Sequence, residues 1–164
     1  MRLVADESRS FTDLSESYYV QSLRCRVGDA LPTPRYAFDP CRTQYSAEAI
    51  VEELHPEKAE RMLGVVDLDL YVPQLSFVFG LADLPGRRAV IALPRLREGF
   101  YGGRDNEALF LARAVKEAVH ELGHTCGLGH CSNRRFVMTF SNFLVDTDHK
   151  DQAFCPVCRR QVQL

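Results

Sequence analysis

The spacing of apolar residues predicts one long amphipathic helix in the second half of the chain. From about Asn106 to Cys126, apolar side chains recur every three or four residues, which places them on one face of a helix. Asp105 or Asn106 can cap the start of this helix, and Gly127 can end it. Residues 128–164 lack a comparable period, so a more irregular C-terminal part is expected.

Shorter apolar runs upstream predict strands and further helices. Strands are expected at residues 2–5, Arg24–Val27, Leu63–Val66 with a continuation toward Tyr71, Leu75–Leu81 and Arg88–Leu93. Helices are expected at Phe11–Leu23, at Ser46–Leu54 with Ser46 as the N-cap, and around Cys158–Val162. Three prolines predict an extended loop over Leu31–Pro40. Pro94 cannot donate to a ladder, so the strand before it is expected to end near a sheet edge. This order predicts a mixed α/β (α+β) fold.

Length and composition narrow the class of protein. With 164 residues and 46% hydrophobic residues, the chain fits one domain, made of a sheet-and-helix part (1–127) and a C-terminal part (128–164). A net charge of −2 argues against a nucleic-acid binder, and no apolar run reaches the ~20 residues of a membrane span. The amino terminus lacks the apolar stretch of a signal peptide. A cytoplasmic monomer with reduced thiols is therefore expected.

The long helix ends in the pattern H-E-x-x-H-x-x-G-x-x-H, which begins at His120. His120 and His124 are four residues apart and lie on one helical face, so both can bind one ion. Gly127 can adopt a positive φ and turn the chain so that His130 becomes the third ligand. Chance would produce this pattern with a probability of roughly 10⁻⁵ over the chain. The motif therefore predicts a zinc site.

The same motif predicts peptide hydrolysis. Three protein ligands leave the fourth zinc position open for water, as in catalytic sites. Glu121 follows the first ligand, and its carboxylate can act as the general base on that water. The alternative function is a zinc-stabilised binding or regulatory module with little or no activity. Glu121 favours the enzyme, because metal binding alone does not require it.

The cysteines predict a second metal site. They are Cys25, Cys41, Cys126, Cys131, Cys155 and Cys158. Cys131 and the C-x-x-C pair Cys155–Cys158 suit a closed structural zinc site. A thioredoxin-type redox pair is disfavoured, because that motif belongs in a βαβ unit for which the following residues offer no elements. Free thiols are the remaining alternative.

Together these residues resemble the archaemetzincins, the metzincin branch in which a cysteine directly follows the third histidine. The resemblance rests on the histidine motif, Cys131, Met138 and the Cys155–Cys158 pair. Upstream segments are also similar to that family: Tyr36, Arg42, Gln44-Tyr45, Phe77–Gly80 and Lys116–Ala118. The resemblance implies a compact metzincin-like metallopeptidase domain with two zinc ions. Met138 would be the Met-turn residue beneath the catalytic zinc.

One position departs from the family pattern. That pattern has a further cysteine five residues after Cys131, where this chain has Phe136. Cys126 is the leading candidate for the missing fourth ligand, because it lies at the end of the long helix. The alternatives are Cys41, Cys25, His149, a water molecule, or an empty site.

The substrate is expected to be a peptide or protein segment. It would lie antiparallel along the Ala89–Leu93 strand and extend the sheet at its edge. The sequence does not identify the group that stabilises the oxyanion; Tyr101 is considered, but no motif points to it.

Overall fold

The structure is a computed structural model that describes residues 25–57 and 59–162. The strand expected at residues 2–5 and the helix expected at Phe11–Leu23 lie outside the described residues. Residues 25–27 are described and belong to no strand, so the strand predicted at Arg24–Val27 is wrong over that stretch.

The strands form two mixed sheets. The first sheet has the order β1 (Phe38–Asp39), β2 (Gln44–Ser46), β4 (Leu70–Val72) and β5 (Leu75–Val78). The second has the order β3 (Met62–Val66), β7 (Arg88–Ala92) and β6 (Gly80–Ala82). In the second sheet, β7 pairs parallel with β3 and antiparallel with β6. In the first, β2 and β4 are parallel and the other pairs are antiparallel. The mixed α/β class is therefore confirmed.

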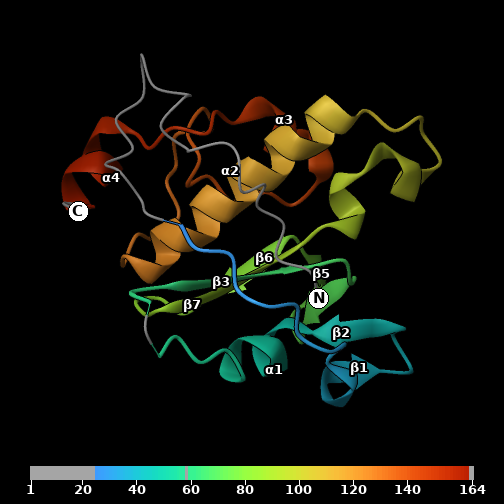
Figure 1. Cartoon of the computed structure of the whole chain (residues 1–164). Coiled ribbons are helices and arrows are strands. Elements are labelled where there is room, and N and C mark those ends of the chain that lie inside the picture. Colours follow the sequence, from blue (N-terminus) through green and yellow to red (C-terminus); the bar gives the residue numbers. More distant parts are fainter. Residues whose placement is uncertain (1–24, 58, 163–164) are drawn as a thin grey trace.

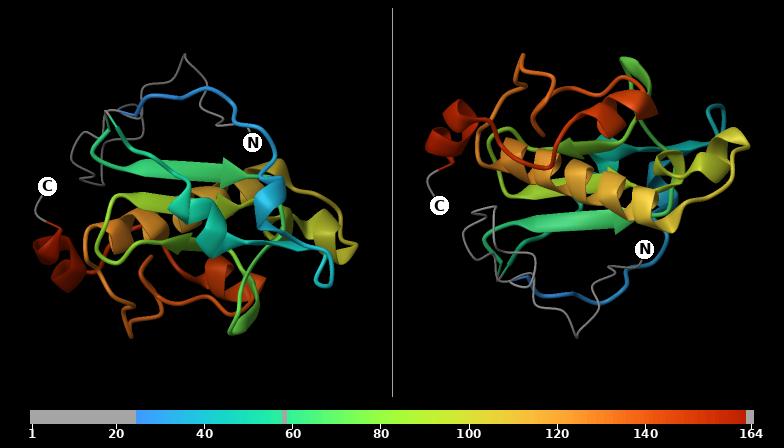
Figure 2. Two further views of the ribbon diagram at one scale, coloured as in Figure 1. Left: turned by 90° about the horizontal axis from the view of Figure 1, so that it is seen from below. Right: turned by 90° about the horizontal axis from the view of Figure 1, so that it is seen from above.

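Helices cover both faces of the second sheet. The α-helices are α1 (Ala47–Glu52), α2 (Glu107–Thr125), α3 (Leu144–His149) and α4 (Pro156–Gln161). The described residues also contain the 3₁₀ helices η2 (Arg35–Ala37), before β1, and η3 (Pro94–Leu96) and η4 (Glu98–Tyr101), between β7 and α2. The long helix α2 lies across one face of this sheet and α1 lies against the other (Figures 1 and 2). The short helix α3 packs beside α2.

Local capping explains where two of these helices begin. The Ser46 hydroxyl accepts a hydrogen bond from the Ala49 backbone N–H (3.2 Å), as predicted for the start of α1. The Asn106 side chain accepts from the Leu109 N–H (3.2 Å) and starts α2. The predicted N-cap Ser46 is confirmed, and of the two candidates for α2, Asp105 and Asn106, the structure selects Asn106. Both caps depend only on neighbouring residues.

Two of the predicted strands are each divided into two shorter strands in the structure. The run Leu75–Leu81 is divided between β5 and β6, which belong to different sheets. The expected continuation from β3 to Tyr71 is a separate strand, β4, in the other sheet. An apolar run does not distinguish one long strand from two short ones, because both bury their side chains.

The prediction that Arg88–Leu93 ends near a sheet edge is wrong. Strand β7 lies in the middle of its sheet, with β3 on one side and β6 on the other. Pro94 begins η3 just beyond the strand, so it removes no ladder hydrogen bond. A substrate cannot add to β7, which also overturns the expected docking along Ala89–Leu93.

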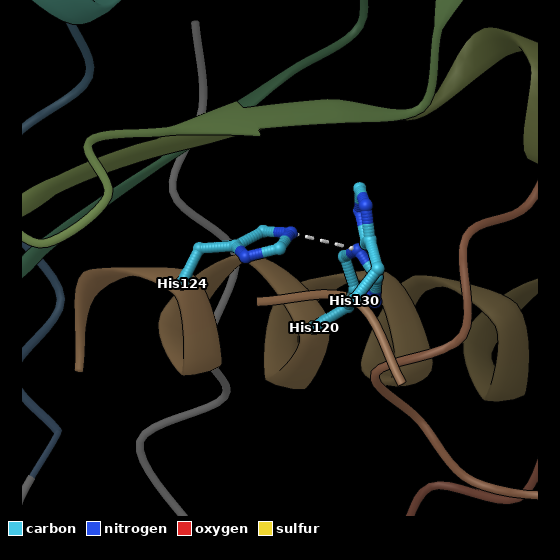
Figure 3. Close-up of side chains that lie close together, drawn as sticks. All are labelled: His120, His124 and His130. Carbon is cyan, nitrogen blue, oxygen red and sulfur yellow. Dashed lines mark hydrogen bonds between the residues drawn. The ribbon is translucent and has the colours of Figure 1, made fainter. Parts of the chain in front are cut away.

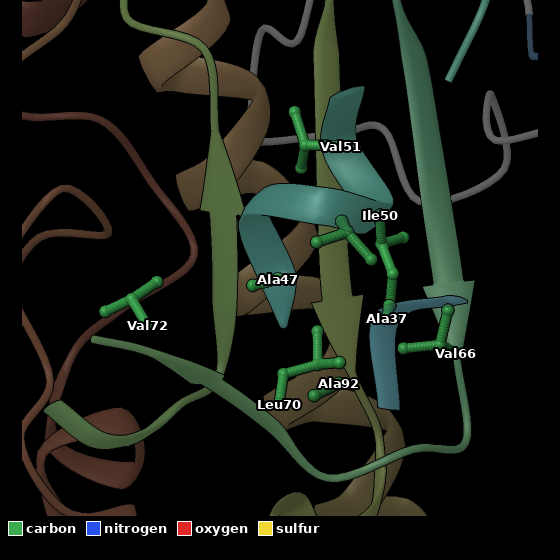
Figure 4. Packing of buried hydrophobic residues seen from close by; sticks show 9 residues of the cluster. Ala37, Ala47, Ile50, Val51, Val66, Leu70, Val72 and Ala92 are labelled. Carbon is green, nitrogen blue, oxygen red and sulfur yellow. The ribbon is translucent and has the colours of Figure 1, made fainter. Parts of the chain in front are cut away.

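The main core lies between α1 and the strands (Figure 4). Its buried residues are Ala37, Ala47, Ile50, Val51, Val66, Leu70, Val72, Val90 and Ala92. This packing holds the second sheet against which α2 rests. None of the helices in the described part combines the length and apolar content that crossing a bilayer requires.

Candidate metal centres

Three histidines meet at one point beside the C-terminal half of α2. His120 and His124 stand one turn apart on the helix, and His130 reaches them from the segment that follows (Figure 3). One ring nitrogen from each lies within 4.8 Å of the others. The structure therefore brings together all three histidines that the motif singled out.

A helix-ending turn returns the chain to this point. Gly127 has φ of +86°, and its N–H donates to the His124 carbonyl (2.8 Å). The next N–H, of Leu128, donates to the Gly123 carbonyl (3.1 Å). These two bonds form a Schellman motif, which requires the left-handed conformation that glycine adopts without a steric penalty. Gly127 thus ends the helix, as predicted, and turns the chain toward His130.

Hydrogen bonds aim the two helical imidazoles at a shared position. The Nδ1 of His120 lies 2.7 Å from the Val137 carbonyl oxygen, and the Nδ1 of His124 lies 2.7 Å from that of Leu128. A carbonyl only accepts, so each Nδ1 carries the proton and each Nε2 keeps its lone pair. The two Nε2 atoms are 3.0 Å apart, the contact drawn in Figure 3. Two nitrogens at 2.0–2.1 Å from one tetrahedral zinc would be about 3.3 Å apart, so the pair fits a shared cation.

Desolvation lowers the pKa of all three imidazoles, of which His130 is the exposed member. Desolvation lowers the pKa of His120 to about 2, with a further contribution from the charge of Lys150. Desolvation also lowers the pKa of His124 and of His130. A histidine binds a metal ion through an unprotonated ring nitrogen, so a lowered pKa suits metal binding.

The carboxyl group of Glu121 is packed against the edge strand of the second sheet. Its residue is buried, and burial together with the nearby charge of Glu117 raises its pKa well above the ordinary value. The close neighbour is Gly80 at the start of β6: a Cβ built there would lie 2.6 Å from both the Cγ and the Oε1 of Glu121. Glycine at position 80 therefore leaves room for the Glu121 side chain.

Replacing Gly80 by alanine should displace the Glu121 side chain. If Glu121 is the general base that the sequence motif predicts, a displacement of roughly 1 Å should reduce hydrolysis by about 100-fold. The added methyl would also meet the Val90 carbonyl oxygen at 2.7 Å, so the strand itself cannot absorb the clash easily. The measurements are kcat/KM, which should fall, and the zinc content, which should stay the same. Gly64→Ala in β3 is the matched control, because its added methyl finds neighbours at 3.5 Å or more. Full activity in Gly80→Ala would show that the Glu121 position is not critical.

A buried ion pair lies near His120 and Glu121. The Lys150 Nζ is 2.9 Å from the Glu117 Oε1, and both side chains are almost fully buried. The Thr147 hydroxyl donates to the same carboxylate oxygen (3.0 Å). The positive charge of Lys150 lowers the pKa of Glu121, which opposes the effect of Glu117. This pair therefore joins α3 to α2 and contributes to the electrostatics around the histidines.

Met138 packs beneath the histidine-bearing turn of α2. It is fully buried, and a Cβ on Gly123 would lie 2.5 Å from its sulfur. The residue before it, Val137, supplies the carbonyl that orients His120. This position suits the Met-turn role that the resemblance implies, and it explains why a glycine lies between the two helical ligands.

Three thiols form a second cluster of metal-binding groups. The Sγ atoms of Cys131, Cys155 and Cys158 lie within 4.8 Å of one another. The Cys158 backbone N–H donates to the Cys155 sulfur (3.3 Å), and this bond is the largest cause of a lowered pKa at Cys155. Burial raises the pKa of Cys158 to about 12. The predicted trio is therefore assembled, with sulfur ligands that suit zinc.

Other candidate ligands are not part of these groups. Cys126, the expected fourth ligand, does not belong to the cluster: its sulfur does not lie within 4.8 Å of all three sulfurs of Cys131, Cys155 and Cys158. The Gly127 turn redirects the chain between Cys126 and Cys131, so the two do not share a helical face. Three other candidates are exposed: Cys25, Cys41 and His149. Tyr101 ends η4, where its hydroxyl interacts with Arg95.

The sequence did not predict two features of the site: the contact of Gly80 with Glu121 and the ion pair of Glu117 with Lys150. The Phe77–Gly80 and Lys116–Ala118 segments had been singled out only for their resemblance, and they contain Gly80 and Glu117. The partner Lys150 carried no signal, because it lies 33 residues further along the chain. Helix α3, which places it there, has only six residues and lacks a clear apolar period.

Comparisons with known proteins agree with this arrangement. The family described as Peptidase family M54 matches residues 29–164. An archaemetzincin of Methanocaldococcus jannaschii is 43% identical over 139 residues, covering 85% of this chain and 77% of that protein. The crystal structure of archaemetzincin from Methanopyrus kandleri aligns with a TM-score of 0.72 and 41% identity, covering 80% of this chain and 73% of that one. A zinc-dependent peptidase of Methanocorpusculum labreanum aligns with a TM-score of 0.73 and 31% identity, covering 83% and 82%. The chain therefore belongs to peptidase family M54, the archaemetzincin family of zinc metallopeptidases.

Proposed function

We propose that this chain hydrolyses peptide bonds with one zinc ion held by His120, His124 and His130, and with Glu121 as the general base. The observation that carries the proposal is the pair of Nε2 lone pairs directed at one position, 3.0 Å apart, on the helix that also carries Glu121. Neutral imidazoles in this arrangement have no proton to share between them, so a cation is the natural occupant.

The chain's own residues supply the proton transfers. When bound, zinc acts as a Lewis acid that polarises the peptide carbonyl and lowers the pKa of water to about 7. Glu121 accepts the proton of the attacking water and delivers it to the leaving amine.

Strand β6 is the proposed docking edge for the substrate. Among the described residues, β6 pairs only with β7, and its first residue, Gly80, lies against Glu121. An extended peptide alongside β6 would add a strand to the sheet, with its main chain passing close to the general base. The substrate class is therefore a peptide or an unfolded protein segment.

A second zinc ion in the cysteine cluster is proposed to be structural. The cluster joins the segment after α2 to α4, and it packs against Leu128, Val137 and Met138. Zinc bound there would stabilise the C-terminal part of the chain, which also contributes the third histidine.

Metal removal tests the proposed function. We expect about two zinc ions per chain, one for each group of ligands, and peptide hydrolysis that a chelator abolishes and added zinc restores. The thiolate site should keep its zinc at chelator concentrations that empty the histidine site. Its sulfur ligands are softer than imidazole nitrogens, and none of its three cysteines is exposed, whereas His130 is. Metal content and hydrolysis of an unfolded protein substrate are measured on the same samples. One firmly held zinc and no hydrolysis would favour the binding module instead.

A further inference from the structure

We propose that the second zinc site of this chain has only three protein ligands and that an exchangeable small ligand from solution fills its fourth coordination position. The inference rests on the second zinc of the proposed function. It is independent of the histidine site and of peptide hydrolysis.

The spacing of the three thiols fits one ion. The sulfurs of Cys131 and Cys155 are 3.8 Å apart. Two sulfurs bound at 2.3 Å to one tetrahedral zinc would be about 3.8 Å apart. All three sulfurs lie within 4.8 Å of one another, so small adjustments of their rotamers are enough to complete the binding geometry.

Backbone hydrogen bonds fix the segment that carries Cys131 next to the one that carries Cys155 and Cys158. The Cys131 N–H donates to the Met138 carbonyl (2.8 Å), and the Val137 N–H donates to that of Ala153 (2.9 Å). The first bond closes the 131–138 segment on itself, and the second joins that segment to the residues that precede α4. The cluster is therefore a built site at the junction of two segments, and not an accidental meeting of mobile side chains.

The described residues offer no fourth side-chain ligand. No other histidine, cysteine, aspartate or glutamate atom in residues 25–57 and 59–162 lies within 4.8 Å of all three sulfurs. Phe136 is half-buried and packs against the cluster, and its ring has no lone pair to donate to a metal. Structural zinc sites are almost always four-coordinate, so three thiolates leave one position to be filled from outside.

Charge and access favour a small neutral ligand. Three thiolates bound to Zn²⁺ leave a single net negative charge, which disfavours a further anion. Cys131 is the partly exposed member of the trio, whereas Cys155 and Cys158 are 6% and 7% exposed. Solution therefore reaches the cluster on the Cys131 side, where water or an imidazole can bind and exchange.

Cobalt substitution tests this coordination directly. The full chain is loaded with Co²⁺, and the sulfur-to-cobalt charge-transfer band is measured, because this band reports only metal bound to thiolates. The intensity of this band grows with the number of thiolates bound to the metal. Phe136→Cys should therefore raise it by about one third, because the number of bound sulfurs rises from three to four. Phe136→Leu, the matched apolar control, should leave it unchanged. Added imidazole should shift the band of the wild type and of Phe136→Leu, but not that of Phe136→Cys.

Zinc affinity gives a second measurement. In competition with a chelator, Phe136→Cys should bind the zinc at its thiolates at least about tenfold more tightly than the wild type. Losing a residue that only hydrogen-bonds to a metal ligand already changes metal affinity by about tenfold or more, so a direct ligand should change it at least as much. If Phe136→Cys does not fold, the sulfur count at zinc by X-ray absorption in a His120→Ala background decides between three and four thiolates.

Two results would overturn the inference. A wild-type band as intense as that of Phe136→Cys and insensitive to imidazole would mean that the protein supplies a fourth ligand, such as Cys126. The absence of a sulfur-to-cobalt band would mean that the thiols bind no metal. Neither result affects the histidine site, whose failure would appear as chelator-insensitive or absent hydrolysis.

Discussion

Glu121→Gln is expected to reduce peptide hydrolysis by about 10²–10⁴-fold while zinc stays bound at both sites. Glutamine has nearly the same shape as glutamate, so it fits the space that Gly80 leaves open. Its amide cannot accept the proton of the attacking water, and it is not a proposed zinc ligand. The measurements are kcat/KM and zinc content. Hydrolysis near the wild-type rate in a preparation of confirmed zinc content would contradict the role of Glu121.

The same substitution should stabilise the metal-free protein at neutral pH. Burial raises the folded-state pKa of Glu121 above its ordinary value of 4.5, so the folded state binds more protons than the unfolded state above that pH. The stability of the wild type therefore falls as pH rises from 4.5 toward the folded-state pKa. Glutamine does not ionise, so Glu121→Gln should melt at least about 2–4 °C higher at neutral pH, the shift that ~1 kcal/mol produces in a chain of this size.

The pH dependence separates this effect from a general gain in stability. The difference in Tm between the two proteins should shrink as pH is lowered toward 4.5, because glutamate is then protonated in both states. Glu57→Gln is the matched control, since Glu57 is exposed and should show little difference at any pH. A constant difference across the pH range would mean that burial of the Glu121 charge is not its cause.

Lys150→Met should cost about 3–5 kcal/mol of folding free energy, because it leaves the carboxylate of Glu117 buried without its cation. In a chain of this size such a loss lowers Tm by roughly 6–20 °C. Methionine fills a similar volume, so the effect reports the lost charge more than lost packing. The measurement is thermal or denaturant unfolding of the zinc-loaded protein.

Two variants make this prediction specific. Lys116→Met should cost less, because Lys116 donates to the backbone carbonyls of Thr147 and Asp148 and leaves no buried charge behind. The double variant Lys150→Met/Glu117→Leu should recover most of the loss, since buried ion pairs are often replaceable by apolar residues. An equal loss in Lys150→Met and the double variant would mean that packing, and not the unpaired carboxylate, sets the cost.

Local residues determined the elements that position the three histidines. The Asn106 cap, the four-residue spacing of His120 and His124 and the turn at Gly127 are all formed within a few positions of the chain. Each depends on hydrogen bonds between near neighbours, so the sequence predicted them correctly. The trio Cys131, Cys155 and Cys158 was predicted from its ligand chemistry, and the structure brings it together.

Long-range pairing decided the rest of the site. The sequence did not show that β7 is central, because a strand's neighbours are set by other segments. For the same reason it did not show that β6 is the edge beside Glu121, or that Lys150 neutralises Glu117. Cys126 was expected to join the thiols because it lies at the end of the long helix, but it is not part of the thiol cluster.

The sequence by itself determined the chemistry of this protein: three imidazoles with a neighbouring carboxylate, and three thiols. These features follow from residue types and from spacing along a helix, which short-range geometry controls. Only the tertiary structure decided which strand lies against Glu121 and how the buried charge of Glu117 is balanced. It also decided that no fourth side chain among the described residues completes the thiol cluster. These depend on contacts between segments distant in the chain, whose partners are selected by packing and burial of the whole fold.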